Sequence, residues 1–159
     1  MVALRQFSDS LARSSWRARP RSFVALMSLY ESNYLRLAAL VGDLRTIAEP
    51  QISRLAGDCD LVLTPLEHCV YTTTLNLTYQ LDDAPAQADP AAARVPDLTI
   101  RAYRDARLAE ALSISGIPFA GLAAERELEH RWARNMVLNK WLDYCTECGH
   151  RFPGAPPGV

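Results

Sequence analysis

The segment LTIRAYRDARLAE, residues 98–110, constrains the fold of this chain more than any other. Its apolar and polar residues alternate with a period of two, which is typical of a β-strand with one buried face. A polar break then separates this strand from a second apolar run. We therefore predict a β-hairpin with Asp105 and Ala106 as its loop residues, a register that places Arg101 directly opposite Glu110.

Two further strands are predicted before the hairpin. Residues 71–81 alternate regularly and are rich in threonine, tyrosine and leucine, which strands prefer. Residues 59–64 form another strand, which we expect to stop near Pro65. A short helix or an irregular segment fits residues 43–57. Four strands with short connections favour an antiparallel sheet.

Helical patterns lie on both sides of the strands. From Ser22 to Gly42, apolar residues recur at spacings of three and four; the serine suits an N-cap and the glycine a helix end. A second such pattern covers residues 125–148. The predicted fold is α+β, a single domain in which a four-stranded antiparallel sheet packs against two long helices, one N-terminal and one C-terminal.

The chain of 159 residues is long enough for one domain, which we place at residues 22–150. Residues 1–21 contain five arginines and one acidic residue and are expected to be a disordered tail. An organellar transit peptide or a weak contact with an anionic partner are the alternatives. We expect the Pro- and Ala-rich residues 82–96 to form a flexible loop and residues 151–159 to form a C-terminal tail.

Charge and composition argue against several classes of protein. The formal net charge of −1 provides no general attraction to nucleic acid. Membrane insertion is not expected, because no apolar run reaches the roughly 18 residues that spanning requires. The sequence shows no secretory signal pattern and has four cysteines, so a reducing, cytoplasmic location is expected.

The candidate ligand-binding site is a group of polar side chains on the hairpin and on the strand expected beside it. Its members are Arg101, Tyr103, Asp105, Glu110, Glu67 and Tyr71. The planar guanidinium of Arg101 would bind a carboxylate or a phosphate. The alternative is structural: Arg101 and Glu110 form a cross-strand ion pair, worth less than about 1 kcal/mol where exposed, and Tyr103 covers the sheet.

A catalytic alternative is a small hydrolase that uses Glu67, Glu110 or His68 as its acid or base. The sequence shows no nucleophile–base pair, so no catalytic residue is assigned and no cofactor is expected. Asn33 and Asn135 lie on the inner sides of the two predicted helices. Their amides are expected to bond to each other or to the backbone at a sheet edge, with ligand contact as the alternative.

The C-terminal sequence CTECGHRF resembles half of a zinc ribbon, because Cys145, Cys148 and His150 are residue types that bind zinc. A complete site needs four ligands, and the second half of the motif is missing. No metal ligand is therefore assigned, and a zinc-stabilised interaction module stays as an alternative. Otherwise Cys145 packs in the core and His150 complements the helix dipole.

Four blocks of sequence carry a family resemblance. They are LYESNYLRL from Leu29, EHCVYTT from Glu67, LTIRAYRDARLAE from Leu98 and NMVLNKWLDYC from Asn135. With these blocks, residues 23–149 resemble the YqiB-like proteins, a bacterial family also called domain of unknown function 1249. The resemblance implies a small, bacterial, cytoplasmic protein and supplies no activity. Because the polar residues are concentrated in one block that shows no reactive group, we predict a non-enzymatic binding or adaptor domain that recognises a protein segment or a small anionic ligand.

Overall fold

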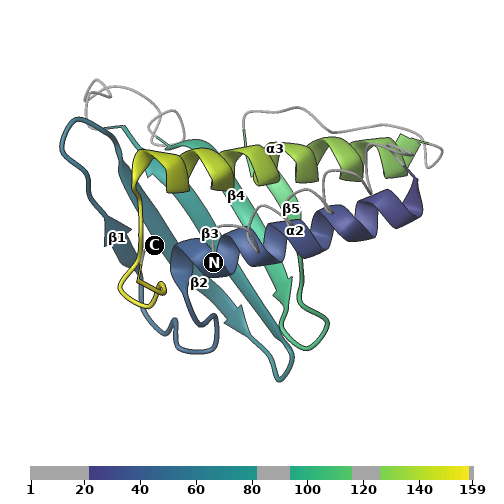
Figure 1. Cartoon of the computed structure of the whole chain (residues 1–159), viewed down its shortest axis with the longest axis horizontal. Helices are drawn as coiled ribbons and strands as arrows, with labels where there is room; N and C mark the ends of the chain where they lie inside the picture. Colours follow the sequence, from purple (N-terminus) through teal and green to yellow (C-terminus); the bar gives the residue numbers. More distant parts are fainter. Residues whose placement is uncertain (1–21, 82–93, 116–125, 158–159) are drawn as a thin grey trace.

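The computed structural model describes residues 22–81, 94–115 and 126–157, so the predicted tail at 1–21 and most of the predicted 82–96 loop lie outside it. The elements in chain order are α2 (Phe23–Val41), β1 (Gln51–Ser53), β2 (Asp60–His68), β3 (Thr72–Gln80), β4 (Arg94–Tyr103), β5 (Leu108–Ser115) and α3 (Glu127–Cys148). The strands form one antiparallel sheet in the order in which they occur in the chain. Both helices lie on the same face of this sheet and run across its strands (Figure 1). The α+β prediction is confirmed.

The sheet has five strands rather than the predicted four. The additional strand, β1, lies within the segment for which a helix or irregular structure was predicted, and it pairs with β2 from Gln51↔Leu63 to Ser53↔Leu61. Three residues are too few to show a period of two. The pairing therefore depends on contact with β2 and not on a local sequence pattern.

The prediction that β2 stops near Pro65 was wrong. The strand continues to His68, with an irregularity in its register between Pro65 and Glu67. Its partner β1 pairs only as far as Leu63, so β2 is an edge strand where the proline lies. Proline is tolerated there because, among the described residues, no second strand on that side of β2 requires the backbone N–H that proline lacks.

The two helices, predicted to be long, contain 19 and 22 residues. In α2 the boundaries are as predicted: the Ser22 hydroxyl accepts a hydrogen bond from the Ala25 N–H at 3.2 Å, and Gly42 ends the helix. The described part of α3 begins at Glu127, two residues later than predicted. It ends at Gly149, which has the left-handed φ of 102° that favours glycine.

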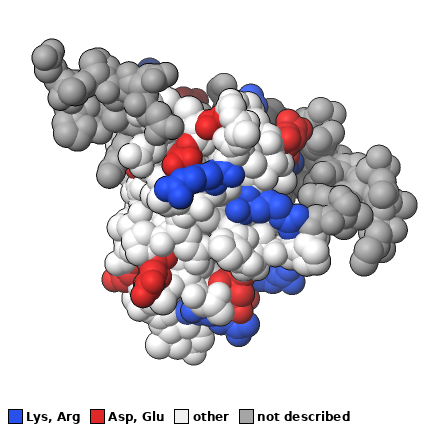
Figure 2. Space-filling model, turned by 90° about the vertical axis from the view of Figure 1, so that its left-hand side faces the viewer, with Lys and Arg blue, Asp and Glu red and all other residues white. Residues whose placement is uncertain are grey.

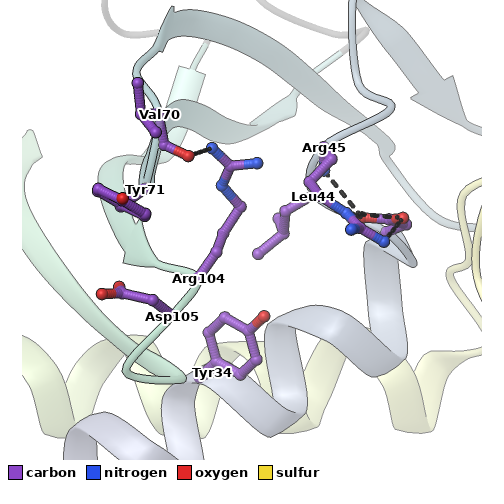
Figure 3. Close-up of a pocket in the computed structure, with 8 residues that line it drawn as sticks. Tyr34, Leu44, Arg45, Val70, Tyr71, Arg104 and Asp105 are labelled. Atoms are coloured by element: carbon purple, nitrogen blue, oxygen red, sulfur yellow. Dashed lines mark hydrogen bonds and ion pairs between the residues drawn. The ribbon is translucent and has the colours of Figure 1, made fainter.

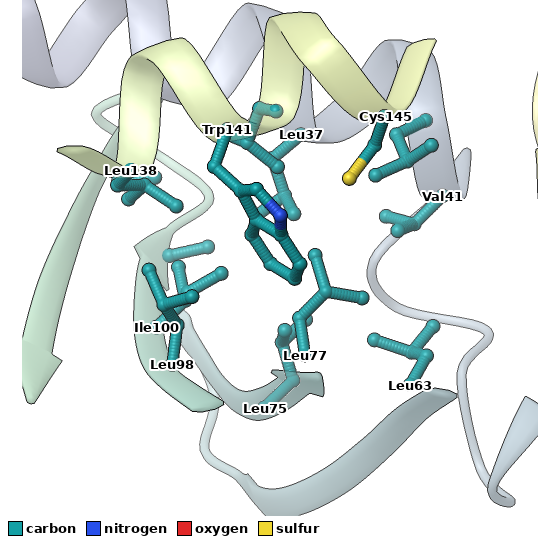
Figure 4. Packing of buried hydrophobic residues seen from close by; sticks show 14 of the residues in the cluster. Leu37, Val41, Leu63, Leu75, Leu77, Leu98, Ile100, Leu138, Trp141 and Cys145 are labelled. Atoms are coloured by element: carbon teal, nitrogen blue, oxygen red, sulfur yellow. The ribbon is translucent and has the colours of Figure 1, made fainter. Parts of the chain in front are cut away.

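The hydrophobic core lies between the helices and the sheet face that they cover. Trp141 of α3 points from its helix toward Leu75 and Leu77 of β3 (Figure 4). Each large apolar side chain in such a core contributes roughly 1.5–3 kcal/mol relative to an exposed position. The largest fully buried side chains are Leu29, Leu37, Leu40, Ile47, Leu61, Leu63, Leu75, Leu77, Leu98, Ile100, Leu138 and Leu142.

The segment after α3 folds back onto the end of α2. Phe152 is buried in the core, and its N–H donates to the Leu40 carbonyl at 3.1 Å. Gly42 has a φ of 82°, and a Cβ on it would lie 1.8 Å from the Gly154 carbonyl oxygen. Only glycine permits this backbone approach, so the segment is held against the helix end at two points.

Side-chain amides cover part of the outer edge of β5, at Ala109 and Ala111. The Asn135 Oδ1 accepts hydrogen bonds from the Ala111 N–H at 2.9 Å and from the Asn33 Nδ2 at 3.2 Å. Asn33 also donates to the Ala109 carbonyl at 3.4 Å and accepts from the Asn139 Nδ2 at 3.0 Å. The predicted structural role of the two buried asparagines is confirmed: they satisfy edge groups that none of the described strands pairs.

The β4–β5 hairpin has the predicted register, with Arg101 opposite Glu110. Its loop, however, contains the four residues 104–107 and not two, and the φ of Arg107 is positive at 56°. The positive φ takes Arg107 out of the extended conformation that pairing with Arg104 would need. On its other side, the Arg104 N–H donates to the Tyr71 carbonyl at 2.8 Å and so continues the β3–β4 pairing into the two turns.

Candidate functional site

A row of polar side chains crosses the sheet face that points away from the helices. The strand register aligns Glu67, Thr74, Arg101 and Glu110, one from each of β2 to β5. The Arg101 Nε donates to the Thr74 Oγ1 at 3.2 Å, and its Nη2 lies 3.8 Å from the Glu67 Oε2. The ion pair expected between Arg101 and Glu110 is thus replaced by one with Glu67. Arg101 is flanked by two carboxylates, which makes it a weak site for a further anion.

Glu110 is held by two tyrosine hydroxyls. Tyr103 donates to its Oε1 at 2.7 Å, and Tyr30 of α2 donates to its Oε2 at 3.2 Å. Burial, and then the negative charge of Glu110, raise the pKa of Tyr30 to about 12; the same causes raise the pKa of Tyr103. Both hydroxyls therefore stay protonated near neutral pH. Glu110 connects β5 to α2 and is already occupied as an acceptor.

The other two predicted site residues, Tyr71 and Asp105, lie at the tips of the two hairpins and line a pocket of about 330 Å³. The pocket is built by α2, the loop after it, the β2–β3 turn and the β4–β5 turn (Figure 3). Its lining residues are Tyr34, Asp43, Leu44, Arg45, Val70, Tyr71, Arg104 and Asp105. We call it the hairpin-tip pocket. The six predicted residues are therefore divided, four on the sheet face and two in the pocket.

Two arginines that sequence analysis did not assign to a site determine the chemistry of the hairpin-tip pocket. Arg104 fastens the turns together, since its Nη2 donates to the carbonyls of Cys69 at 2.6 Å and Val70 at 2.8 Å. Arg45 pairs with Asp43, with 2.8 Å between Nη2 and Oδ2, and this hydrogen bonding lowers the pKa of Asp43 to about 2. Both arginines lie in loops, where the alternation that marks strands gives no signal.

The three residues of the hydrolase alternative do not line this pocket. Glu67 and Glu110 belong to the sheet-face row, and His68 is engaged elsewhere. Its Nε2 lies 2.6 Å from the Ile47 carbonyl oxygen, which can only accept, so this nitrogen is the donor. Its Nδ1 lies 3.3 Å from the Thr73 Oγ1. With both ring nitrogens bonded, the histidine joins the loop before β1 to the sheet.

The residues of the zinc alternative are dispersed. Within the described ranges, no three His, Cys, Asp or Glu side chains are placed to hold a metal ion. Cys145 is buried in the core and Cys148 is exposed. Cys145 thus packs in the core as a small apolar side chain, which was the alternative to zinc binding.

His150, which follows the C-terminal end of α3, is fully buried. Its Nδ1 lies 3.0 Å from the Ser53 Oγ, and its Nε2 lies 3.4 Å from the Asp58 Oδ2. These are the residue types of a catalytic triad, but Ser53 is only 6 % exposed and its Oγ also accepts the Arg151 N–H at 3.1 Å. The group therefore connects β1 to the chain after α3 and leaves a substrate no access to the serine.

The cysteines provide a test of this packing. Burial raises the pKa of Cys145 to about 12, so its thiol stays protonated at pH 8. We expect iodoacetamide at pH 8 to alkylate Cys145 more than about tenfold more slowly than the exposed Cys69 and Cys148, as measured by peptide mass spectrometry. In urea all three should react. Equal rates for Cys145 and Cys148 in the folded protein would show that Cys145 is not buried.

The charges on one side of the molecule are mixed. On the face shown in Figure 2, acidic and basic side chains lie interspersed, and neither sign forms a broad patch. Such a face has no strong attraction for a polyanion such as nucleic acid. No helix in the described ranges has both the length and the apolar character needed to cross a membrane.

These features define a class of protein: an α+β fold whose single antiparallel sheet carries two helices on one face and a ligand-sized pocket at its hairpin tips. A family model described as "Protein of unknown function (DUF1249)" matches residues 36–151, and the chain belongs to this family. The match covers every residue that lines the hairpin-tip pocket except Tyr34. No curated protein and no solved structure matches the chain.

Proposed function

We propose that this protein is a non-enzymatic binding domain that recognises a small ligand bearing an anionic group in the hairpin-tip pocket. The observation that carries the proposal is the convergence on one pocket of Arg104, which forms no salt bridge in the described part of the chain, and of the Arg45–Asp43 pair, from loops far apart in the sequence. Guanidinium groups are the preferred partners of carboxylates and phosphates in proteins. Tyr34 and Tyr71 add aromatic surface to the same pocket.

The size of the pocket supports a small molecule. A volume of about 330 Å³ is at the lower end of the range for small-molecule sites, which suits a metabolite. An adaptor role is the second form of the proposal, in which an acidic side chain of a protein partner supplies the anion. The strong exposure of Val70 and Tyr71 at the rim favours it, because apolar side chains there would be covered by a partner.

We also infer a cytoplasmic location. The four cysteines are free thiols, and in an oxidising compartment exposed thiols such as Cys69 and Cys148 are prone to form disulfides.

A thermal-shift comparison of two arginine variants tests the proposal. The wild type and Arg45→Ala are screened with carboxylates, phosphorylated metabolites and nucleotides. A ligand at about 100 times its Kd is expected to raise the Tm of the wild type by roughly 5 °C or more. The shift should be largely lost in Arg45→Ala, because the variant removes one guanidinium and leaves the Asp43 carboxylate unpaired in the pocket.

The matched control is Arg54→Ala. Arg54 and Arg45 have side chains that are each 71 % exposed, and each pairs with an aspartate, but Arg54 does not line the pocket. The ligand shift should persist in this control. Arg104 is left unchanged because it fastens the two turns. A shift that is equal in all three proteins, or no shift with any compound, would contradict a small anionic ligand in this pocket.

A further inference from the structure

The charges of the hairpin-tip pocket fall into a paired set and an unpaired set. Arg45 donates to Asp43 through Nε at 3.0 Å and Nη2 at 2.8 Å, and also through its backbone N–H at 3.0 Å. This pair cancels one charge of each sign. Within the described part of the chain, neither Arg104 nor Asp105 forms a salt bridge, although the charge of Arg104 also acts on Asp43. One guanidinium and one carboxylate therefore stay available, on adjacent residues of one turn.

The available groups of this pocket lie on different sides of it. In Figure 3 the Arg104 guanidinium lies beside Val70, and the Asp105 carboxylate lies below the Tyr71 ring. The Nη2 of Arg104 is used by backbone carbonyls and its Nε is buried without a hydrogen-bond partner, so Nη1 is the nitrogen left to meet a ligand. A ligand that carried only negative charge would be attracted by the Arg104 guanidinium and repelled by the Asp105 carboxylate. A multiply charged anion would be repelled most, because Asp43 is also ionised in this pocket.

The remaining lining of the pocket is apolar or aromatic. Leu44, Val70 and the rings of Tyr34 and Tyr71 provide this surface, and the volume of about 330 Å³ leaves room for a ligand of metabolite size. An apolar ligand side chain would gain free energy by leaving water there.

From these charges and this surface we infer that the ligand is a zwitterion of amino-acid size with an apolar or aromatic side chain. Its carboxylate meets Arg104, its ammonium group meets Asp105, and its side chain lies against the tyrosines. The inference rests on the proposed function and narrows the ligand class of that site.

The experiment is isothermal titration calorimetry of the wild-type chain with three related probes. Phenylalanine carries both charges, N-acetylphenylalanine carries only the carboxylate, and phenylalaninamide carries only the ammonium group. Phenylalanine is expected to bind about fivefold or more tightly than either analogue, the effect of one charge pair near the surface.

The variant Asp105→Asn removes the unpaired carboxylate with almost no change in size. In this variant the affinity for phenylalanine should fall to that for N-acetylphenylalanine, while the affinity for N-acetylphenylalanine stays unchanged or rises. Glu49→Gln is the matched control, since Glu49 is exposed and does not line the pocket. It should bind all three probes as the wild type does.

Two results would overturn the inference and leave the proposed function intact. One is equal binding of phenylalanine and N-acetylphenylalanine by the wild type. The other is binding of a carboxylate or phosphate from the wider screen, with loss in Arg45→Ala, when none of the three phenylalanine probes binds. If no compound binds the wild type at all, the proposed function itself is wrong, and the zwitterion inference is wrong with it.

Discussion

Replacing Phe152 with alanine is expected to lower the free energy of unfolding by about 4 kcal/mol. The side chain is 2 % exposed and belongs to the main core, although it comes from the segment after α3. Its removal takes away apolar burial and leaves a cavity that the surrounding leucines fill only in part. Urea denaturation followed by circular dichroism measures the change as a shift of the midpoint.

The matched control for this substitution is Phe23→Ala. Phe23 is 66 % exposed at the start of α2, so its truncation should change the free energy of unfolding by less than about 1 kcal/mol. If Phe152→Ala were no more destabilising than the control, the segment after α3 would not be part of the folded core.

The second large effect is expected at the covered edge of β5. Asn135→Leu keeps the approximate size of the side chain but removes the acceptor for the Ala111 N–H and for the Asn33 amide. The Ala111 N–H would be left buried without a partner, while Asn33 would keep its bond to the Ala109 carbonyl and lose the shorter one to Asn135 Oδ1. We expect this to cost about 2 kcal/mol of unfolding free energy. Urea denaturation of the variant measures this loss.

Gln80→Leu replaces an exposed amide in the same way and serves as the control, with an expected change within about 0.5 kcal/mol. Native-state hydrogen exchange adds a local measurement, because the Ala111 N–H should exchange faster in Asn135→Leu. An unchanged midpoint together with unchanged protection at Ala111 would show that the amides do not stabilise this edge.

The parts of the fold that follow local rules could be predicted from the sequence. A period of two gave the register of Arg101 opposite Glu110, and Ser22 and Gly42 gave the ends of α2. The three residues of β1 could not be predicted, because so short a strand has no pattern of its own. The path of β2 past Pro65 depends on where β1 stops pairing, which is a property of the assembled sheet.

The candidate site was predictable only in part, for a related reason. Alternation along the strands identified the polar face with Arg101. It could not show that Glu110 accepts a hydrogen bond from Tyr30, which is 80 residues away in the sequence. The hairpin-tip pocket likewise combines residues from position 34 to position 105. Arg45 and Arg104 lie in loops whose approach depends on the packing of the whole sheet.

The amide-covered edge of β5 also restricts how copies of this protein can associate. An incoming strand would have to displace Asn33 and Asn135 from the Ala109 carbonyl and the Ala111 N–H before it could pair with β5. The opposite edge consists of β1, which has only three residues, and of β2 from Thr64 to His68, where Pro65 lacks an N–H and the register is irregular. Edge-to-edge growth, the route to domain-swapped oligomers and fibrils, is therefore opposed at Ala109 and Ala111 on one side of the sheet and meets a short strand and an irregular one on the other.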